Sequence, residues 1–199
     1  MATAQPTATK LMIIRHAEKP SSQLPPFGVT ADGQQDAESL IVRGWQRAGA
    51  LVPFFSSPQN AAIAPPQFIF ASQIKATAAE PQLGSKSERA QASVTPLIDK
   101  LGSKVTVNFT FAKGAETDLA DAAIACAGIV LICWEHQSIL TITKQLPVNS
   151  STPVPTTWPV DSQGHSRFDL VWVFTLDQPS ATYKFSQVAQ LLLAGDSPT

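Results

Sequence analysis

The sequence lacks the features that mark several large classes of protein. It has only two cysteines in 199 residues, which is too few for a disulfide framework. Its apolar runs, such as Ile129 to Trp134, are much shorter than the about 20 residues that a membrane-spanning helix needs. Its 14 Lys and Arg are balanced by 15 Asp and Glu and form no basic cluster, so we expect neither nucleic acid nor a membrane as a partner. The expected partner is a small molecule.

The rest of the composition is typical of one folded domain. Hydrophobic residues make up 44% of the chain and the mean hydropathy is +0.04, so the chain can bury a sizeable core. We predict a single domain over residues 1–199, in which residues 1–9 form a flexible N-terminus. The first residues lack the basic stretch and the apolar stretch of a secretory signal, so we expect a cytoplasmic location.

Short apolar segments alternate with segments of helical periodicity. Strands are predicted at Leu11–Ile14, Phe68–Ala71, Val105–Phe111, Ile129–Trp134 and Leu170–Leu176. Helices are predicted at about Arg43–Phe55, Ala90–Leu101, Asp118–Cys126, Gln137–Leu146 and Ser186–Leu193. Several strands are apolar throughout, which is typical of a sheet covered by helices on both faces. The predicted fold class is therefore α/β, a three-layer α/β/α sandwich with a mainly parallel central sheet.

Basic and imidazole side chains follow the predicted strands. Arg15 and His16 come directly after the first strand, and His136 lies just beyond the fourth. Arg89 lies in the first turn of the helix that follows the second strand. Because parallel strands end at the same edge of a sheet, where sites form, we expect these four side chains to meet there.

The order and spacing of these residues resemble the histidine phosphatase superfamily, which has the phosphoglycerate-mutase-like fold. The motifs that carry the resemblance are Arg15-His16 after a strand, the helix pattern of Leu40, Gly44, Arg47 and Ala48, Arg89-Ala90 shortly before Pro96-Leu97, and a strand that ends before His136. The resemblance runs from about Leu11 to Ile139, and residues 158–174 are similar to the closing strand of some small members. Most relatives have glycine after the first histidine, where this chain has Ala17, a residue that several phosphatase-like members tolerate.

The resemblance implies a phosphomonoesterase that acts on a phosphorylated small molecule or a phosphoprotein and needs no metal or cofactor. It implies that His16 attacks phosphorus to form a phosphohistidine, which water hydrolyses, and that Arg15, His16, Arg89 and His136 bind the phosphate. Elementary chemistry supports these roles. Guanidinium groups form paired, charge-assisted hydrogen bonds to phosphate oxygens, and an imidazole becomes a nucleophile when an acceptor holds its other nitrogen.

The leaving alkoxide needs a proton, so we expect a carboxylic acid near the mouth of the pocket. In many relatives this acid lies between the second arginine and the second histidine, which favours Glu116. Glu18 and Glu135 are alternatives, although Glu135 is expected to face away from the pocket if His136 points into it. Another branch of the superfamily uses an aspartic acid after the second histidine, but Gln137 stands there and cannot donate a proton as an acid.

Two other kinds of site fit the sequence less well. Cys133, His136 and His165 lack the paired spacing of a structural zinc site, so no metal is expected. Gly44 and Gly49 have the spacing of the two glycines of a P-loop, but Ala50 stands where that motif requires lysine.

Two other functions stay open. A phosphoglycerate-mutase-like phosphoryl transferase would return the phosphoryl group to a second hydroxyl, and a catalytically silent module would only bind phosphorylated ligands. Lys19, just past the predicted nucleophile, is expected to favour polyanionic substrates. The loops Pro20 to Gly33 and Asn149 to Gly164 are expected to set the substrate preference, and the sequence leaves the oligomeric state open.

Overall fold

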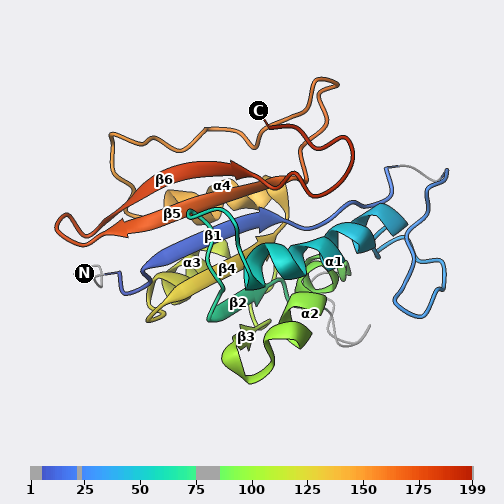
Figure 1. The fold of residues 1–199 in the computed structure, drawn as a ribbon, viewed down its shortest axis with the longest axis horizontal. Coiled ribbons are helices and arrows are strands. Elements are labelled where there is room, and N and C mark those ends of the chain that lie inside the picture. The colour runs from blue at the N-terminus through green and yellow to red at the C-terminus, as the bar shows by residue number, and fades with distance from the viewer. Residues whose placement is uncertain (1–5, 22–23, 75–85, 199) are drawn as a thin grey trace.

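The computed structural model of the protein describes residues 6–21, 24–74 and 86–198 (Figure 1). The strands in this part of the chain are β1 (Lys10–Arg15), β2 (Phe68–Ala71), β3 (Thr106–Asn108), β4 (Ile129–Trp134), β5 (Leu170–Asp177) and β6 (Thr182–Ala189). They form one sheet in the order β3-β2-β4-β1-β5-β6. β1 to β4 run parallel, whereas β5 and β6 are antiparallel to their neighbours. The carboxyl ends of β1, β2 and β4 therefore lie at the same edge as the amino end of β5.

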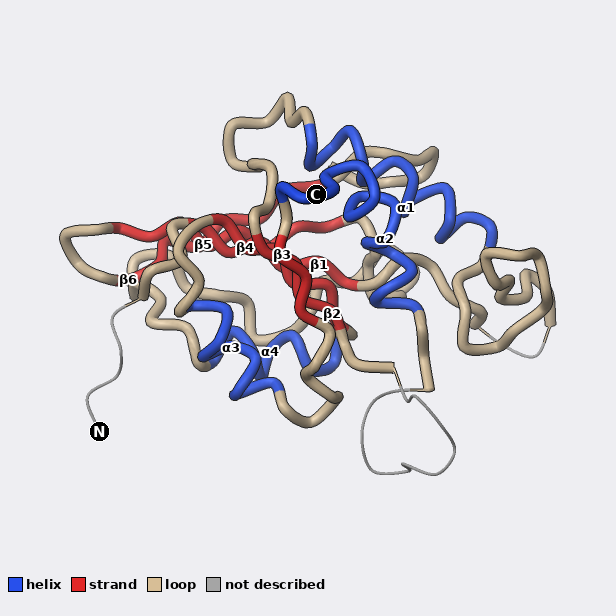
Figure 2. Tube along the Cα trace, turned by 90° about the horizontal axis from the view of Figure 1, so that it is seen from below, coloured by secondary structure: helices blue, strands red, loops and turns tan. Residues whose placement is uncertain are grey.

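Helices cover both faces of this sheet (Figure 2). They are α1 (Val42–Ser56), α2 (Arg89–Leu101), α3 (Glu116–Ile124) and α4 (His136–Lys144), with a short 3-10 helix at Gly102–Lys104. α1 and α2 pack on one face, and α3 and α4 pack on the other. The predicted fold class, a three-layer α/β/α sandwich with a mainly parallel sheet, is therefore confirmed.

Side chains of each central strand alternate between the two faces, as strand geometry requires. In β1, Leu11 and Ile13 join the core under α3 and α4, whereas Met12 and Ile14 join the core under α1 and α2. Both sets are fully buried, which explains why the strands read as continuous apolar runs.

Helix α1 lies very close to the loop that follows β1, and a glycine makes this contact possible. A Cβ atom on Gly44 would lie 2.4 Å from the carbonyl oxygen of Glu18, which is closer than real contacts allow. Glycine in the Leu40, Gly44, Arg47 and Ala48 pattern thus lets the helix approach the backbone just beyond the candidate nucleophile.

One helix predicted from the sequence is wrong, and one predicted strand is too long. The helix predicted at Ser186–Leu193 is absent, because residues 182–189 form β6 and pair with all eight residues of β5. The strand predicted at Val105–Phe111 is limited to Thr106–Asn108, which pairs with β2 along one edge only.

The N-terminal segment is partly tied to the domain. The backbone N–H groups of Thr7 and Ala8 donate to the carbonyl of Ile124, and that of Thr9 donates to the carbonyl of Gly128. Residues 1–5 of the predicted flexible N-terminus, and residues 22–23 of the first predicted rim loop, lie outside the described residues. None of the helices in the described part of the chain has the length and apolar character needed to cross a membrane.

Candidate active site

The candidate site lies where β1 and β4 end side by side. Arg15, the last residue of β1, pairs with Trp134, the last residue of β4. The pairing extends one step further, because the backbone N–H of His16 donates to the carbonyl of Trp134 at 3.0 Å. His16 is thereby placed beside Glu135 and His136, which follow directly on β4.

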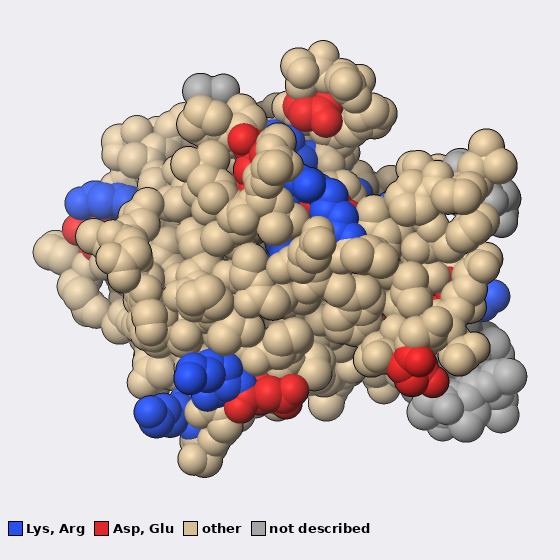
Figure 3. Space-filling view, turned by 45° about the vertical axis from the view of Figure 1, so that its right-hand side comes forward, with Lys and Arg blue, Asp and Glu red and all other residues tan. Residues whose placement is uncertain are grey.

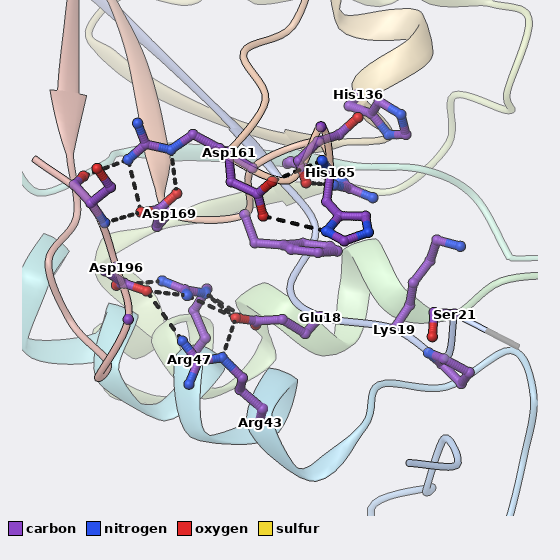
Figure 4. Close-up of a pocket in the computed structure, with 18 residues that line it drawn as sticks. Glu18, Lys19, Ser21, Arg43, Arg47, His136, Asp161, His165, Asp169 and Asp196 are labelled. Carbon is purple, nitrogen blue, oxygen red and sulfur yellow. Dashed lines mark hydrogen bonds and ion pairs between the residues drawn. The ribbon is translucent and has the colours of Figure 1, made fainter. Parts of the chain in front are cut away.

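Two cavities open at this edge. The larger, of about 680 Å³, is lined by Arg15, Lys19 and His136, by the turn at residues 164–169 and by the C-terminal residues 195–197 (Figure 4). The smaller, of about 60 Å³, is lined by His16, Ser72, Ser87, Arg89, Ala90, Lys113, Trp134 and Glu135. The four predicted site residues thus divide into two pairs, since neighbouring residues at a strand end face opposite sides.

His16 is buried and held in one tautomer. The residue is only 6% exposed, and its Nδ1 lies 2.8 Å from the carbonyl oxygen of Ala17. A carbonyl can only accept, so Nδ1 carries the proton and Nε2 keeps a free lone pair. Burial lowers the pKa of His16 to about 3, and the positive charges of Arg15 and Arg89 act in the same direction. The ring is therefore neutral at physiological pH, as a nucleophile must be.

Arg15 is fixed by one backbone group and one aromatic ring. Its Nη1 donates to the carbonyl of Ser166, and its guanidinium carbon lies 3.6 Å from the centre of the Phe168 ring. Its Nε is buried and has no hydrogen-bond partner among the described residues. Burial lowers the pKa of Arg15 to about 10, so the side chain still carries a positive charge at neutral pH.

Arg89, the first residue of α2, is held by the segment before α1. Its Nη2 donates to the carbonyl of Ala37 at 2.5 Å, and its Nε donates to the carbonyl of Ser39 at 3.3 Å. Its only ion pair in the described part of the chain is a long one, 3.5 Å to the half-exposed carboxylate of Glu38. Burial lowers the pKa of Arg89, while the negative charges of Glu38 and Asp36 oppose this effect.

His136 begins α4 and faces the larger cavity (Figure 4). Its Nδ1 is buried without a hydrogen-bond partner among the described residues. Burial lowers the pKa of His136, and the charges of Arg15 and Lys19 lower it further. A neutral imidazole with a free ring nitrogen can accept or donate one hydrogen bond to a ligand in this cavity.

Lys19 adds a further positive charge. Its side chain points into the larger cavity (Figure 4) and makes no ion pair with the residues that the structure describes. Burial lowers the pKa of Lys19, and so do the charges of Arg89 and Arg15. Arg89 also lowers the pKa of Arg15, so a bound anion would relieve the repulsion among these three cations. In the space-filling view, Lys and Arg side chains gather in a recess bordered by acidic side chains (Figure 3).

The three carboxylates considered as proton donors lie in different places. Glu116 accepts hydrogen bonds from Nε1 of Trp134 at 3.0 Å and from the N–H of Gly114 at 3.1 Å, and it lines neither cavity. Burial raises the pKa of Glu116, but its hydrogen bonds, with those from Gly114 and Trp134 the strongest, outweigh burial, and the pKa lies below its ordinary value. Its carboxylate is therefore ionised at neutral pH.

The other two carboxylates line one cavity each. Glu18 lines the larger cavity and is paired with Arg47 at 2.7 Å and Arg43 at 3.2 Å. Glu135 lines the smaller cavity with His16, and it pairs with Nζ of Lys113 at 2.8 Å. Glu135 and His136 face different cavities, as strand alternation predicts. Glu135 shares its cavity with His16.

Several residues of the site were missed by the sequence analysis. Phe168 and Ser166 hold Arg15, and the carboxylate of Asp196 accepts from Arg47 at 2.8 Å (Figure 4). Because β5 is antiparallel to β1, its amino end lies at the site edge, but no local sequence pattern indicates this direction. No sequence signal places the C-terminal segment there.

Comparison with known proteins gives a similar fold at low sequence identity. No family model matches the chain, and no curated protein matches it. A solved structure from Agrobacterium tumefaciens, assigned as the phosphohistidine phosphatase SixA, is 11% identical with a TM-score of 0.48, over 91% of this chain and 98% of that one. A structure described as mycobacterial hydrolase 2 is 12% identical with a TM-score of 0.44, over 95% of this chain and 93% of that one. Both similarities therefore extend over nearly the whole length of the chain.

Proposed function

We propose that the protein is a metal-independent phosphomonoesterase of the histidine phosphatase superfamily, with His16 as the nucleophile. The observation that carries this proposal is the state of His16. Its ring is buried and neutral, Nδ1 is held by the Ala17 carbonyl, and the charges of Arg15, Arg89 and Lys19 surround it. A neutral imidazole among cations suits attack on a phosphate ester, which brings its own negative charge.

The proposed reaction has two steps. In the first, Nε2 of His16 forms a bond to phosphorus while the ester P–O bond breaks, and the leaving alkoxide takes a proton from an acid. In the second, the oxygen of a water molecule attacks phosphorus and gives a proton to the carboxylate that the acid left in the first step, the N–P bond breaks, and inorganic phosphate leaves. The ring carries a positive charge in the phosphohistidine, and the hydrogen bond from Nδ1 to the Ala17 carbonyl becomes charge-assisted.

Two arginines and a histidine are assigned to the transferring phosphoryl group. Arg15 offers its unpartnered Nε from the larger cavity, Arg89 lies with His16 in the smaller one, and His136 offers its unpartnered Nδ1. Charge builds on the equatorial oxygens in the transition state, so positioned cationic donors supply most of the catalysis. The larger cavity, of about 680 Å³, is of a size that takes the leaving group of a small phosphate ester.

The proton donor is assigned to Glu135 in this proposal, in preference to Glu116. Glu135 lines the cavity of the nucleophile, and its pair with Lys113 is partly exposed, with 27% of the Glu135 side chain and 53% of the Lys113 side chain accessible. Such a pair is worth about 0–1 kcal/mol, so little free energy is needed to separate the Glu135 carboxylate from Lys113. The role of Glu116, favoured by the sequence, stays a competing prediction.

The test is hydrolysis of p-nitrophenyl phosphate by chelator-treated protein, beside the His16→Ala variant. We expect the rate to survive chelation and to disappear with His16→Ala. The control is Thr95→Ala, which changes an exposed residue of α2 that lines neither cavity and should keep the activity. Quenching at alkaline pH should trap one phosphoryl group on the wild-type chain and none on His16→Ala.

Other outcomes would contradict the proposal in different ways. Wild-type protein that binds vanadate but hydrolyses no ester would be a silent binding module. Transfer of the trapped group to an added alcohol in preference to water would identify a phosphoryl transferase. A rate that is unchanged by His16→Ala would remove His16 as the nucleophile.

A further inference from the structure

We propose that Ser93 is a positioning residue. Its hydroxyl holds the backbone of Ala17, which orients the His16 ring, and joins that backbone to the backbone of Arg89. This inference rests on the proposed function, because it assigns Ser93 a part in preparing the same nucleophile. Ser93 lies one helical turn after Arg89 in α2 and is fully buried.

The Ser93 hydroxyl bridges two segments that are far apart in the sequence. Its Oγ accepts a hydrogen bond from the backbone N–H of Ala17 at 2.7 Å, and it donates to the carbonyl of Arg89 at 2.7 Å. One hydroxyl therefore ties the segment just after β1 to the first turn of α2.

The bond to Ala17 acts on the nucleophile through the backbone. β1 ends at Arg15, and the last ladder hydrogen bond is made by the N–H of His16. Ala17 therefore has no strand partner for its own N–H, and Ser93 supplies one. The carbonyl of the same Ala17 accepts the Nδ1 proton of His16 at 2.8 Å, so fixing Ala17 fixes the tautomer and the direction of Nε2.

A hydroxyl that bonds only to a carbonyl one turn earlier in its own helix would not hold Ala17. Thr95 in the same helix also donates to a carbonyl one turn earlier, that of Gln91 at 2.9 Å, but it is exposed and its side chain makes no hydrogen bond to another segment of the described chain. Such back-bonds slightly weaken a helix and carry no specific role. The second bond, to Ala17, distinguishes Ser93 from this ordinary case.

The test compares Ser93→Thr with Ser93→Val. The two new side chains have nearly the same volume and differ in the hydroxyl, so any crowding from the added methyl groups is common to both. We expect kcat of Ser93→Val to fall at least about tenfold below that of Ser93→Thr, because small displacements of a nucleophile are costly. Thermal unfolding midpoints measured beside the rates separate this effect from a loss of folded protein.

A spectroscopic readout makes the test independent of turnover. In the wild type and in Ser93→Thr, the ¹⁵N chemical shifts of His16 should report a single tautomer with the proton on Nδ1. In Ser93→Val they should report a mixture of tautomers. Thr95→Ala is the matched control, and it should change neither kcat nor the His16 shifts.

Two results would overturn the inference while leaving His16 as the nucleophile. One is equal kcat in Ser93→Thr and Ser93→Val, and the other is an unchanged Nδ1–H tautomer in Ser93→Val. If His16→Ala keeps the wild-type rate, the proposed function fails instead, and the tautomer comparison still decides whether Ser93 orients the ring. Ser93→Ala gives the same comparison if crowding prevents both larger variants from folding.

Discussion

The guanidinium of Arg15 lies against the face of the Phe168 ring, with 3.6 Å between its central carbon and the ring centre. Phe168 also stands near His16, with 6.1 Å between the two ring centres. One aromatic side chain therefore contacts Arg15 and borders His16, the proposed nucleophile, from the amino end of β5. A cation over an aromatic face is held in its plane without using any of its donors. Arg15 thus keeps its buried Nε for a ligand.

This contact predicts that Phe168→Leu weakens phosphate binding more than Phe168→Tyr. A cation–π contact is worth about 0.5–2 kcal/mol, which corresponds to about a twofold to thirtyfold loss of affinity. Leucine fills part of the space but offers no aromatic face, whereas tyrosine keeps the ring. The measurement is the dissociation constant of inorganic phosphate or vanadate by calorimetry. Equal affinities in the two variants would show that the ring acts only by filling space.

The placement of the carboxylates predicts different effects for Glu135→Gln and Glu116→Gln. Glu135→Gln should slow esters of weakly acidic phenols about a hundredfold or more and change esters of acidic phenols little, because only the former need a proton in the transition state. Glu116→Gln should slow all esters equally, since its carboxylate is bound to Trp134 and Gly114 away from both cavities. The measurement is the dependence of kcat/KM on the pKa of the leaving phenol.

The reverse pattern would return the donor role to Glu116. Lys113→Met is the matched control for Glu135, because it removes the ion-pair partner at 2.8 Å and leaves the carboxylate in place. It should not steepen the dependence on the leaving group.

The sequence predicts the central part of the fold because local signals and burial agree there. Residues 10–15 and 129–134 are apolar throughout, and both strands are buried between two helical layers. The polar residues that follow them had to lie at one edge of a parallel sheet. The four residues at that edge could therefore be predicted, but their division between two cavities depends on the direction of each side chain beyond the strand ends.

The sequence could not predict the parts that depend on long-range pairing. Residues 186–193 have apolar spacings that suit a helix, but pairing with β5 outweighs this local preference in β6. Phe168 reaches the site because β5 runs antiparallel to β1, which no local pattern indicates. Asp196 reaches it through an ion pair with Arg47 across 149 positions in the chain.

This ion pair predicts that Arg47→Met lowers the free energy of unfolding by about 3–5 kcal/mol. The Arg47 side chain is 2% exposed and bonds to Glu18 at 2.7 Å and Asp196 at 2.8 Å, whose side chains are 9% and 3% exposed. Its removal leaves two buried carboxylates without their main partner. The measurement is urea unfolding at neutral pH.

The matched control is Lys184→Met, which breaks a largely exposed pair with Asp177 at 3.1 Å. That change should lower the free energy of unfolding far less than Arg47→Met does, because exposed ion pairs contribute little. Adding Glu18→Gln and Asp196→Asn to Arg47→Met should recover part of the loss, because no unpaired buried charge then remains. Equal costs for Arg47→Met and Lys184→Met would contradict a stabilising role for the buried network.

The depressed pKa of His16 predicts how this proposed nucleophile responds to acid. Burial lowers this pKa to about 3, the hydrogen bond to Ala17 opposes the shift, and the charges of Arg15, Arg89 and Lys19 add to it. Protonation would occupy the lone pair of Nε2, so a ring with an ordinary pKa of about 6.5 would lose activity below neutral pH. With the lowered pKa, His16 stays neutral as the pH falls from about 7 to about 5, and kcat should show no loss that follows this ring.

The same shift ties stability to pH. In the unfolded chain His16 has its ordinary pKa of about 6.5, so below that pH the unfolded state takes up a proton that the folded state excludes. The contribution of neutral His16 to the free energy of unfolding is therefore present in full above about pH 6.5. It is lost as the pH falls toward the folded pKa of about 3. Urea unfolding from pH 7 to pH 4.5 should show a shallower loss of stability for His16→Gln than for the wild type, because glutamine does not titrate. ¹⁵N shifts of His16 that titrate with a midpoint near 6.5 in the folded protein would contradict both expectations.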